Sequence, residues 1–150
     1  MSEKIYVGAD HVGFQLKNRL VEELKRLGYE PVDVGPKTLD PADDYPDYAK
    51  PVAEAVSAGK VQRGVLTCGT GLGMSYTANR FPQVRAALAW NEEIAELARK
   101  HGDSNLLVLP AQFVNEEQGV SILHKWLETN FEGGRHDRRI KKIEPTTDDG

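Results

Sequence analysis

Apolar and polar positions recur along the chain with two alternating periods, one typical of buried strands and the other of amphipathic helices. Five short runs have the character of strands: residues 4–7, 30–34, 65–67, 84–89 and 106–109. Five segments between and after them predict helices: residues 13–27, 48–58, 74–79, 91–100 and a long one from 115 through 127. Asn91 and Asn115 stand at the beginning of the last two, where each is a suitable N-cap.

This alternation predicts an α/β fold, in which a parallel sheet is covered by helices on both faces. The length of 150 residues suits one domain spanning 1–150. Within it, residues 133–143 form a basic segment, and residues 145–150 are expected to be a frayed tail. Right-handed crossovers bring the carboxyl ends of all strands to one edge, where open α/β sheets bind ligands.

Composition excludes several classes of function. A net charge of -4 gives no electrostatic footprint for nucleic acid. No apolar leader and no run long enough to span a bilayer is present, so no membrane partner is expected. The single cysteine cannot form an internal disulfide, which fits a reducing, cytoplasmic location.

One stretch concentrates candidate chemistry. The predicted strand at residues 65–67 runs into Cys68, and Gly69, Gly71 and Gly73 follow at alternate positions. Glycines let backbone N–H groups approach a ligand closely, and such groups before a helix N-terminus form an anion site. The functional interpretation is a catalytic cysteine beside an oxyanion hole. The structural interpretation is a tight turn with an inert, buried thiol, and this stretch alone favours neither.

Other polar residues should reach the same edge of the sheet. Asp10 and His11 follow the first strand, as Cys68 and Thr70 follow the third. The segment 101–105 precedes the fifth strand and should therefore begin at the opposite edge. Either its loop rises back over the sheet, or it serves the site of a neighbouring subunit.

Several motifs together resemble those of a known family. They are residues 8–14 (GADHVGF), 44–49 (DYPDYA), 68–74 (CGTGLGM), 78–80 (ANR), 85–86 (RA), 98–101 (ARKH) and 133–136 (GGRH). In this order, over roughly residues 4–143, they resemble the type B ribose-5-phosphate isomerases, a family that also includes galactose-6-phosphate and allose-6-phosphate isomerases.

This resemblance implies a Rossmann-like three-layer α/β/α sandwich with a five-stranded parallel sheet. It also implies a metal-independent aldose–ketose isomerase without a cofactor, acting on a small phosphorylated sugar as a homodimer or homotetramer. It implies ribose 5-phosphate and ribulose 5-phosphate as the substrate pair.

The resemblance assigns roles to the loop after the third strand. Cys68 would be the base of an enediolate mechanism, and the backbone N–H groups of residues 69–74 would hold the developing oxyanion. Thr70 would relay a proton between the sugar oxygens. An ordinary thiol has a pKa of about 8.5, so the loop and the helix N-terminus are expected to favour the thiolate. Met74 cannot be a base, which leaves Cys68 as the only candidate in the loop.

Further roles come from the same resemblance. His101 would open the sugar ring, Asp10 would orient the sugar hydroxyls, and the phosphate would be bound by His11, Arg135 and Arg139. The remaining substrate-binding residues are Gly69, Gly71, Gly73, Met74 and Asn105.

Without the resemblance, structural interpretations of these residues would be preferred. The arginines would form a solvated basic face and His11 would be a loop histidine. His124 and His136 keep a structural interpretation in either case.

Two positions depart from the family pattern. Gly102 stands where asparagine usually follows the ring-opening histidine, and Gln112 stands where most members carry arginine or lysine. Both departures leave the reaction type in place, but they leave open which sugar is the substrate. A six-carbon sugar is among the alternatives.

Other functional classes fit less well. A thiol phosphatase needs arginine at position 74, and the first strand lacks a G-x-G-x-x-G fingerprint. No spacing of carboxylates and histidines predicts a metal-dependent isomerase. The serious rival is a non-catalytic sugar-phosphate binding module. Such a module would lack the base, and the presence of Cys68 and His101 favours the enzyme.

Overall fold

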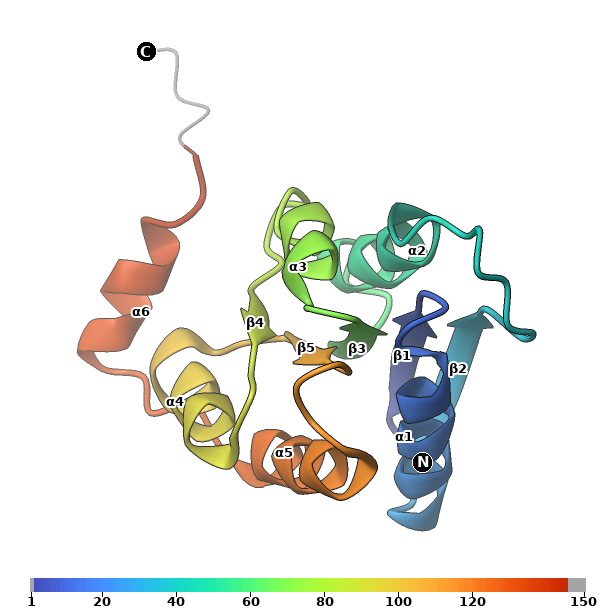
Figure 1. Ribbon diagram of the computed structural model, residues 1–150. Coiled ribbons are helices and arrows are strands. Elements are labelled where there is room, and N and C mark those ends of the chain that lie inside the picture. The colour runs from blue at the N-terminus through green and yellow to red at the C-terminus, as the bar shows by residue number, and fades with distance from the viewer. Residues whose placement is uncertain (1, 146–150) are drawn as a thin grey trace.

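The computed structural model describes residues 2–145, in which five parallel strands form one sheet between two layers of helices (Figure 1). The strands are β1 (Lys4–Ala9), β2 (Glu30–Gly35), β3 (Arg63–Cys68), β4 (Ala86–Leu88) and β5 (Leu106–Pro110), in the order β2-β1-β3-β5-β4. The helices are α1 (Phe14–Arg26), α2 (Pro46–Ser57), α3 (Leu72–Ala78), α4 (Glu92–Gly102), α5 (Glu116–Glu128) and α6 (Arg135–Lys141). Among residues 2–145, no helix combines the length and apolar character needed to cross a membrane.

Each face of the sheet buries its own apolar core. Helices α1, α4 and α5 cover one face, where Leu20, Leu123 and Trp126 pack against side chains of β1, β3 and β5 (Figure 1). Helices α2 and α3 cover the other, where Val52 and Met74 pack against the alternate side chains of the central strands. The three-layer α/β/α sandwich with a five-stranded parallel sheet is therefore confirmed.

The two asparagine caps are also confirmed. Asn91 accepts a hydrogen bond from the backbone N–H of Ile94 at 2.9 Å. Asn115 and Gln118 form a reciprocal capping box, each side chain accepting from the other residue's N–H at 2.8 Å. Local sequence thus fixes where α4 and α5 begin.

Two elements differ from the sequence expectation. The fourth strand is shorter than predicted, because the N–H of Val84 closes a turn onto the carbonyl of Phe81 instead of joining the sheet. The basic segment 133–143 contains α6, which no apolar periodicity predicted and which packs against α4 at the side of the molecule (Figure 1). The predicted tail lies outside the described residues from 146 onward.

A tight backbone contact joins the loop after β1 to the end of β3. The N–H of Asp10 donates to the carbonyl of Thr67 at 3.2 Å, and the Thr67 hydroxyl donates to the carbonyl of Gly13 at 2.8 Å. The Asp10 carboxylate in turn accepts from the N–H of Gly13 at 2.9 Å. A Cβ at Gly13 would lie 2.4–2.6 Å from atoms of Thr67, so only glycine allows this approach.

We predict that Gly13→Ala lowers the free energy of unfolding by about 1–3 kcal/mol, the usual cost of forcing a group into packed space. Urea denaturation measures this change. Gly102→Ala is the matched control, because a Cβ there meets nothing within 4 Å. That control should be neutral or stabilising by about 0.4–1 kcal/mol. Equal stability of the two variants would show that the contact is not tight.

Candidate active site

Cys68 ends β3 with its side chain buried on the face of the sheet covered by α2 and α3. The backbone N–H of Gly71 donates to its Sγ at 3.2 Å. The loop is held from β5, since the N–H groups of Ala111 and Gln112 donate to the carbonyls of Cys68 and Gly69 at 2.8 and 2.9 Å. The thiol therefore lies in a fixed loop at the carboxyl edge of the sheet.

The glycine loop is packed too closely to admit side chains. Gly71 has a φ of 80°, and a Cβ there would approach Leu88 to 2.3 Å. A Cβ at Gly73 would lie 2.5 Å from the ring of Tyr45. Thr70 is exposed, and its hydroxyl accepts from the N–H of Leu72 at 3.2 Å.

Sequence reasoning gave Tyr45 no role at this loop. Its ring nevertheless lies against the backbone of Gly73. The signal that could have found it is its place in the motif at 44–49. Met74 contributes only backbone to the loop, because its side chain is fully buried in the core.

In the single chain the pKa of Cys68 is raised overall, so the expected thiolate is not favoured, although the N–H groups of the loop act in the predicted direction. Burial raises the pKa of the Cys68 thiol, and the nearby Asp10 carboxylate raises it further. The N–H groups of Met74, Gly71 and Thr70 lower the pKa but do not offset the burial. The N–H groups of the loop thus lower the pKa of Cys68 as expected, but desolvation of the thiol raises it by more.

Asp10 and His11 lie at the same edge, as predicted. Asp10 is buried and, through its hydrogen bond with Gly13, is fixed close enough to Cys68 to act on its pKa. The Nδ1 atom of His11 lies 2.8 Å from Oδ1 of Asp43, whose side chain is buried, and this hydrogen bond raises the pKa of His11. The structure thus adds Asp43, from the loop between β2 and α2, as the residue that favours a charged His11.

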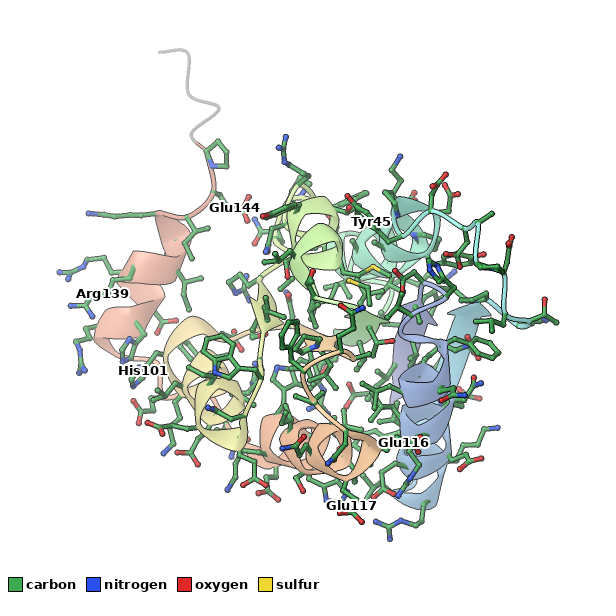
Figure 2. All side chains as sticks on the ribbon, in the orientation of Figure 1. Tyr45, His101, Glu116, Glu117, Arg139 and Glu144 are labelled. Atoms are coloured by element: carbon green, nitrogen blue, oxygen red, sulfur yellow. The ribbon has the colours of Figure 1, made fainter. Side chains whose placement is uncertain are left out.

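His101, Arg135 and Arg139 are not brought to this edge within the chain. His101 lies in the last turn of α4, and both arginines belong to α6. Figure 2 shows His101 and Arg139 together on the α4–α6 side of the molecule. Tyr45 lies on the other side, near α2 and α3. The candidate site therefore has two separated halves.

Around His101 the structure gathers a cluster that the sequence analysis missed. The His101 and His136 rings stack with centroids 4.4 Å apart, and Glu132 Oε1 lies 3.7 Å from Nε2 of each. The backbone N–H of Glu132 donates to the carbonyl of Lys100 at 3.0 Å, which ties the two segments together. A carboxylate and histidine cluster therefore exists where sequence spacing indicated none.

His136 is buried, unlike a typical surface histidine. Burial lowers its pKa, and the charges of Arg135, His101 and Arg139 add to this effect. Only the four-residue interval between Glu132 and His136 was visible in the sequence. The contribution of His101 depends on tertiary structure.

Asn105 lies at the amino end of β5, and its side chain is already engaged. Its Oδ1 accepts from the N–H of Arg85 and its Nδ2 donates to the carbonyl of Gln83, both at 2.8 Å. These bonds hold the turn before β4. They favour a structural role for Asn105 over the contact with substrate that was expected.

Comparisons with known proteins identify the family of the chain. The pattern of the ribose/galactose isomerase family matches residues 5–143. Ribose-5-phosphate isomerase B of Escherichia coli is 42% identical over 141 residues, which cover 94% of each chain. A probable ribose-5-phosphate isomerase B of Mycoplasma pneumoniae is 41% identical over 143 residues, covering 95% of this chain and 94% of the relative.

Solved structures extend the likeness to three dimensions. Ribose-5-phosphate isomerase B of Mycoplasma genitalium, crystallised with bound ribulose-5-phosphate, has a TM-score of 0.92 and 44% identity over 95% of each chain. A ribose 5-phosphate isomerase of Thermotoga maritima has a TM-score of 0.91 and 43% identity, covering 95% of this chain and 98% of that one. By sequence, fold and length alike, the chain belongs to the ribose/galactose isomerase family.

Proposed function

We propose that this chain is an aldose–ketose isomerase that interconverts ribose 5-phosphate and ribulose 5-phosphate without a metal or cofactor. The observation that carries the proposal is Cys68, a thiol fixed in an N–H-lined loop beside the buried carboxylate of Asp10. The relative with bound ribulose-5-phosphate supports the choice of substrate. A cytoplasmic location stays a prediction.

The loop supplies the groups that an enediolate mechanism needs. As a thiolate, Cys68 removes the proton from C2 of the open-chain aldose, and the electrons move to the C1 oxygen. The N–H groups of residues 69–74 stabilise that oxyanion, while the Thr70 hydroxyl transfers the remaining proton from the C2 oxygen to the C1 oxygen. The thiol then returns its proton to C1 and the ketose forms, with Asp10 accepting hydrogen bonds from sugar hydroxyls.

Formation of the thiolate calls for positive charge near Cys68, and in this half of the site His11 is the group whose pKa is raised toward the charged form. Because burial raises the pKa of Cys68, a cation near the thiol would favour deprotonation. His11 lies at this edge, where the phosphate of the proposed substrate would bind. The arginines of α6 are the obvious further source of charge, but they lie on the far side of the same chain.

We therefore propose that two copies of the chain build each site, as a homodimer or a homotetramer of such dimers. One copy provides Cys68, Asp10 and His11, and the other provides His101, Arg135 and Arg139. Exposed apolar residues at the carboxyl edge support a contact surface around the loop. They are Val12, Leu72, Tyr76, Trp90 and Phe113, of which Trp90 is 54% and Phe113 70% exposed.

A second candidate function, isomerisation of another sugar phosphate, rests on Gln112 and Gly102. A Cβ at Gly69 would lie 3.1 Å from the Gln112 side chain, so Gln112 contacts the loop itself. Compared with the arginine or lysine of most family members, an uncharged amide at this position would bind phosphate more weakly. Gly102 has open space around it, which would leave room for a larger sugar beside His101.

We predict that Cys68→Ala lowers kcat by about 10²–10⁴-fold, the usual contribution of a general base. Assay of ketose formation measures this, and circular dichroism should show an unchanged fold. Thr77→Ala is the control, because it removes a hydroxyl bonded to the carbonyl of Gly73 but no proposed catalytic group. Turnover of Cys68→Ala near that of the control would contradict the role of Cys68 and favour a binding module.

The shared site predicts complementation between two inactive variants. When Cys68→Ala and His101→Ala chains are mixed and allowed to exchange subunits, each mixed dimer contains one intact site. A random equal mixture should recover about a quarter of the wild-type activity, because half of symmetric dimers are then mixed. Fully exchanged mixtures without activity would show that each site is built within one chain.

The Gln112 departure predicts a change in substrate binding. Gln112→Arg should lower the KM for ribose 5-phosphate by about 10–100-fold, since a charge-assisted bond to phosphate contributes roughly 1.5–3 kcal/mol. The turnover number should change little, as is typical of added uniform binding. Gln62→Arg, an exposed change before β3, controls for net charge. Equal KM values for ribose 5-phosphate in both variants would show that the Gln112 departure does not affect substrate binding.

A further inference from the structure

The cluster of His101, Glu132 and His136 contains three groups that can bind a metal ion. Their ligand atoms, two imidazole nitrogens and one carboxylate oxygen, all lie within 4.8 Å of one another. They come from the end of α4, the loop before α6 and the first turn of α6. The hydrogen bond from the Glu132 N–H to the Lys100 carbonyl fixes the loop against the end of α4.

His136 gives an independent indication of a ligand. Its side chain is only 7% exposed, and its Nε2 has no hydrogen-bond partner among residues 2–145. That atom lies 3.7 Å from Glu132 Oε1, which is too far for a hydrogen bond. A buried nitrogen without a partner is costly, and an ion at this point would satisfy it.

We propose that His101, Glu132 and His136 form a binding site for a divalent transition-metal ion of the zinc type. Two imidazoles and a carboxylate are a common set of protein ligands for zinc, with a fourth position left for water. The ion would lie outside the Cys68 loop and take no part in the metal-independent reaction proposed above, although His101 belongs to both sites.

The distances between the three ligand atoms fit a zinc site if one histidine ring turns. Zinc binds nitrogen at about 2.0–2.1 Å, so two ligands of a tetrahedral ion lie about 3.3 Å apart. Glu132 Oε1 is 3.7 Å from each histidine nitrogen, close to this separation. The stacked rings cannot both face one ion, so one must turn. His101 is 47% exposed and free to do so, whereas His136 is held in place by its burial.

Neighbouring charges select the kind of ion. Arg135 and Arg139 lie close to His136 and oppose any cation that binds through charge alone. One carboxylate cannot offset them for Mg²⁺ or Ca²⁺, which prefer several oxygen ligands. Zn²⁺ and Co²⁺ bind imidazole strongly and fit the set better.

Binding would have a functional consequence that rests on the proposed function. An ion on His101 Nε2 would occupy a ring nitrogen of the histidine proposed to open the sugar ring. Zn²⁺ should therefore inhibit isomerisation, and a chelator should restore it. Metal binding itself can be measured without turnover, so failure of the proposed reaction would not be confused with failure of this site.

The test is titration of the full-length protein with Co²⁺ alone, followed by the visible absorption of tetrahedral Co²⁺. One equivalent should bind per chain. His136→Phe, which keeps the stacked ring but removes its nitrogens, and Glu132→Gln, an exposed change that leaves the fold in place, should each weaken binding at least about tenfold. Cys68→Ala and His124→Gln should leave binding unchanged, since they remove another possible ligand and a distant histidine.

Absence of tetrahedral Co²⁺ absorption in the wild type would overturn the proposal. So would binding that survives both Glu132→Gln and His136→Phe, or binding that is lost in Cys68→Ala. Wild-type absorption that both cluster variants abolish and both control variants retain would establish the site.

Discussion

The close approach of Gly13 to Thr67 is the contact on which the candidate site depends. It joins the loop after β1 to the end of the adjacent strand β3 and leaves no room for a side chain at Gly13. Because of it, the buried carboxylate of Asp10 is held beside the thiol of Cys68. The thiol of Cys68 is buried separately, on the face of the sheet covered by α2 and α3, and this burial raises its pKa.

Much of the fold could be predicted from the sequence, because the responsible interactions are local. Apolar periodicity indicated the strands and most helices, and the side chains of Asn91 and Asn115 cap α4 and α5 through neighbours only three residues away. Helix α6 escaped prediction because its seven residues carry a single aliphatic side chain, Ile140, and give no amphipathic pattern. Its position depends on packing against α4, which no local signal encodes.

The candidate site was predictable where it follows the ends of strands. Cys68, Asp10 and His11 meet at the carboxyl edge as parallel topology requires. The sign of the Cys68 pKa shift was not predictable, because it depends on the balance between burial and nearby N–H groups. The His101, Glu132 and His136 cluster was equally hidden, since His101 and Glu132 are 31 residues apart in the sequence. Sequence motifs thus identified groups capable of chemistry, and tertiary structure determined their surroundings.

The central claim is that a second chain completes the site. Cys68 is the only cysteine, so a Cys68→Ala background permits thiols to be introduced at chosen positions. Thr70→Cys chains, exposed at the loop, can be mixed with His101→Cys chains and treated with a short thiol crosslinker. We predict covalent dimers containing one chain of each kind, identified by mass spectrometry. A chain carrying both cysteines that crosslinks only within itself, as a monomer, would contradict the claim.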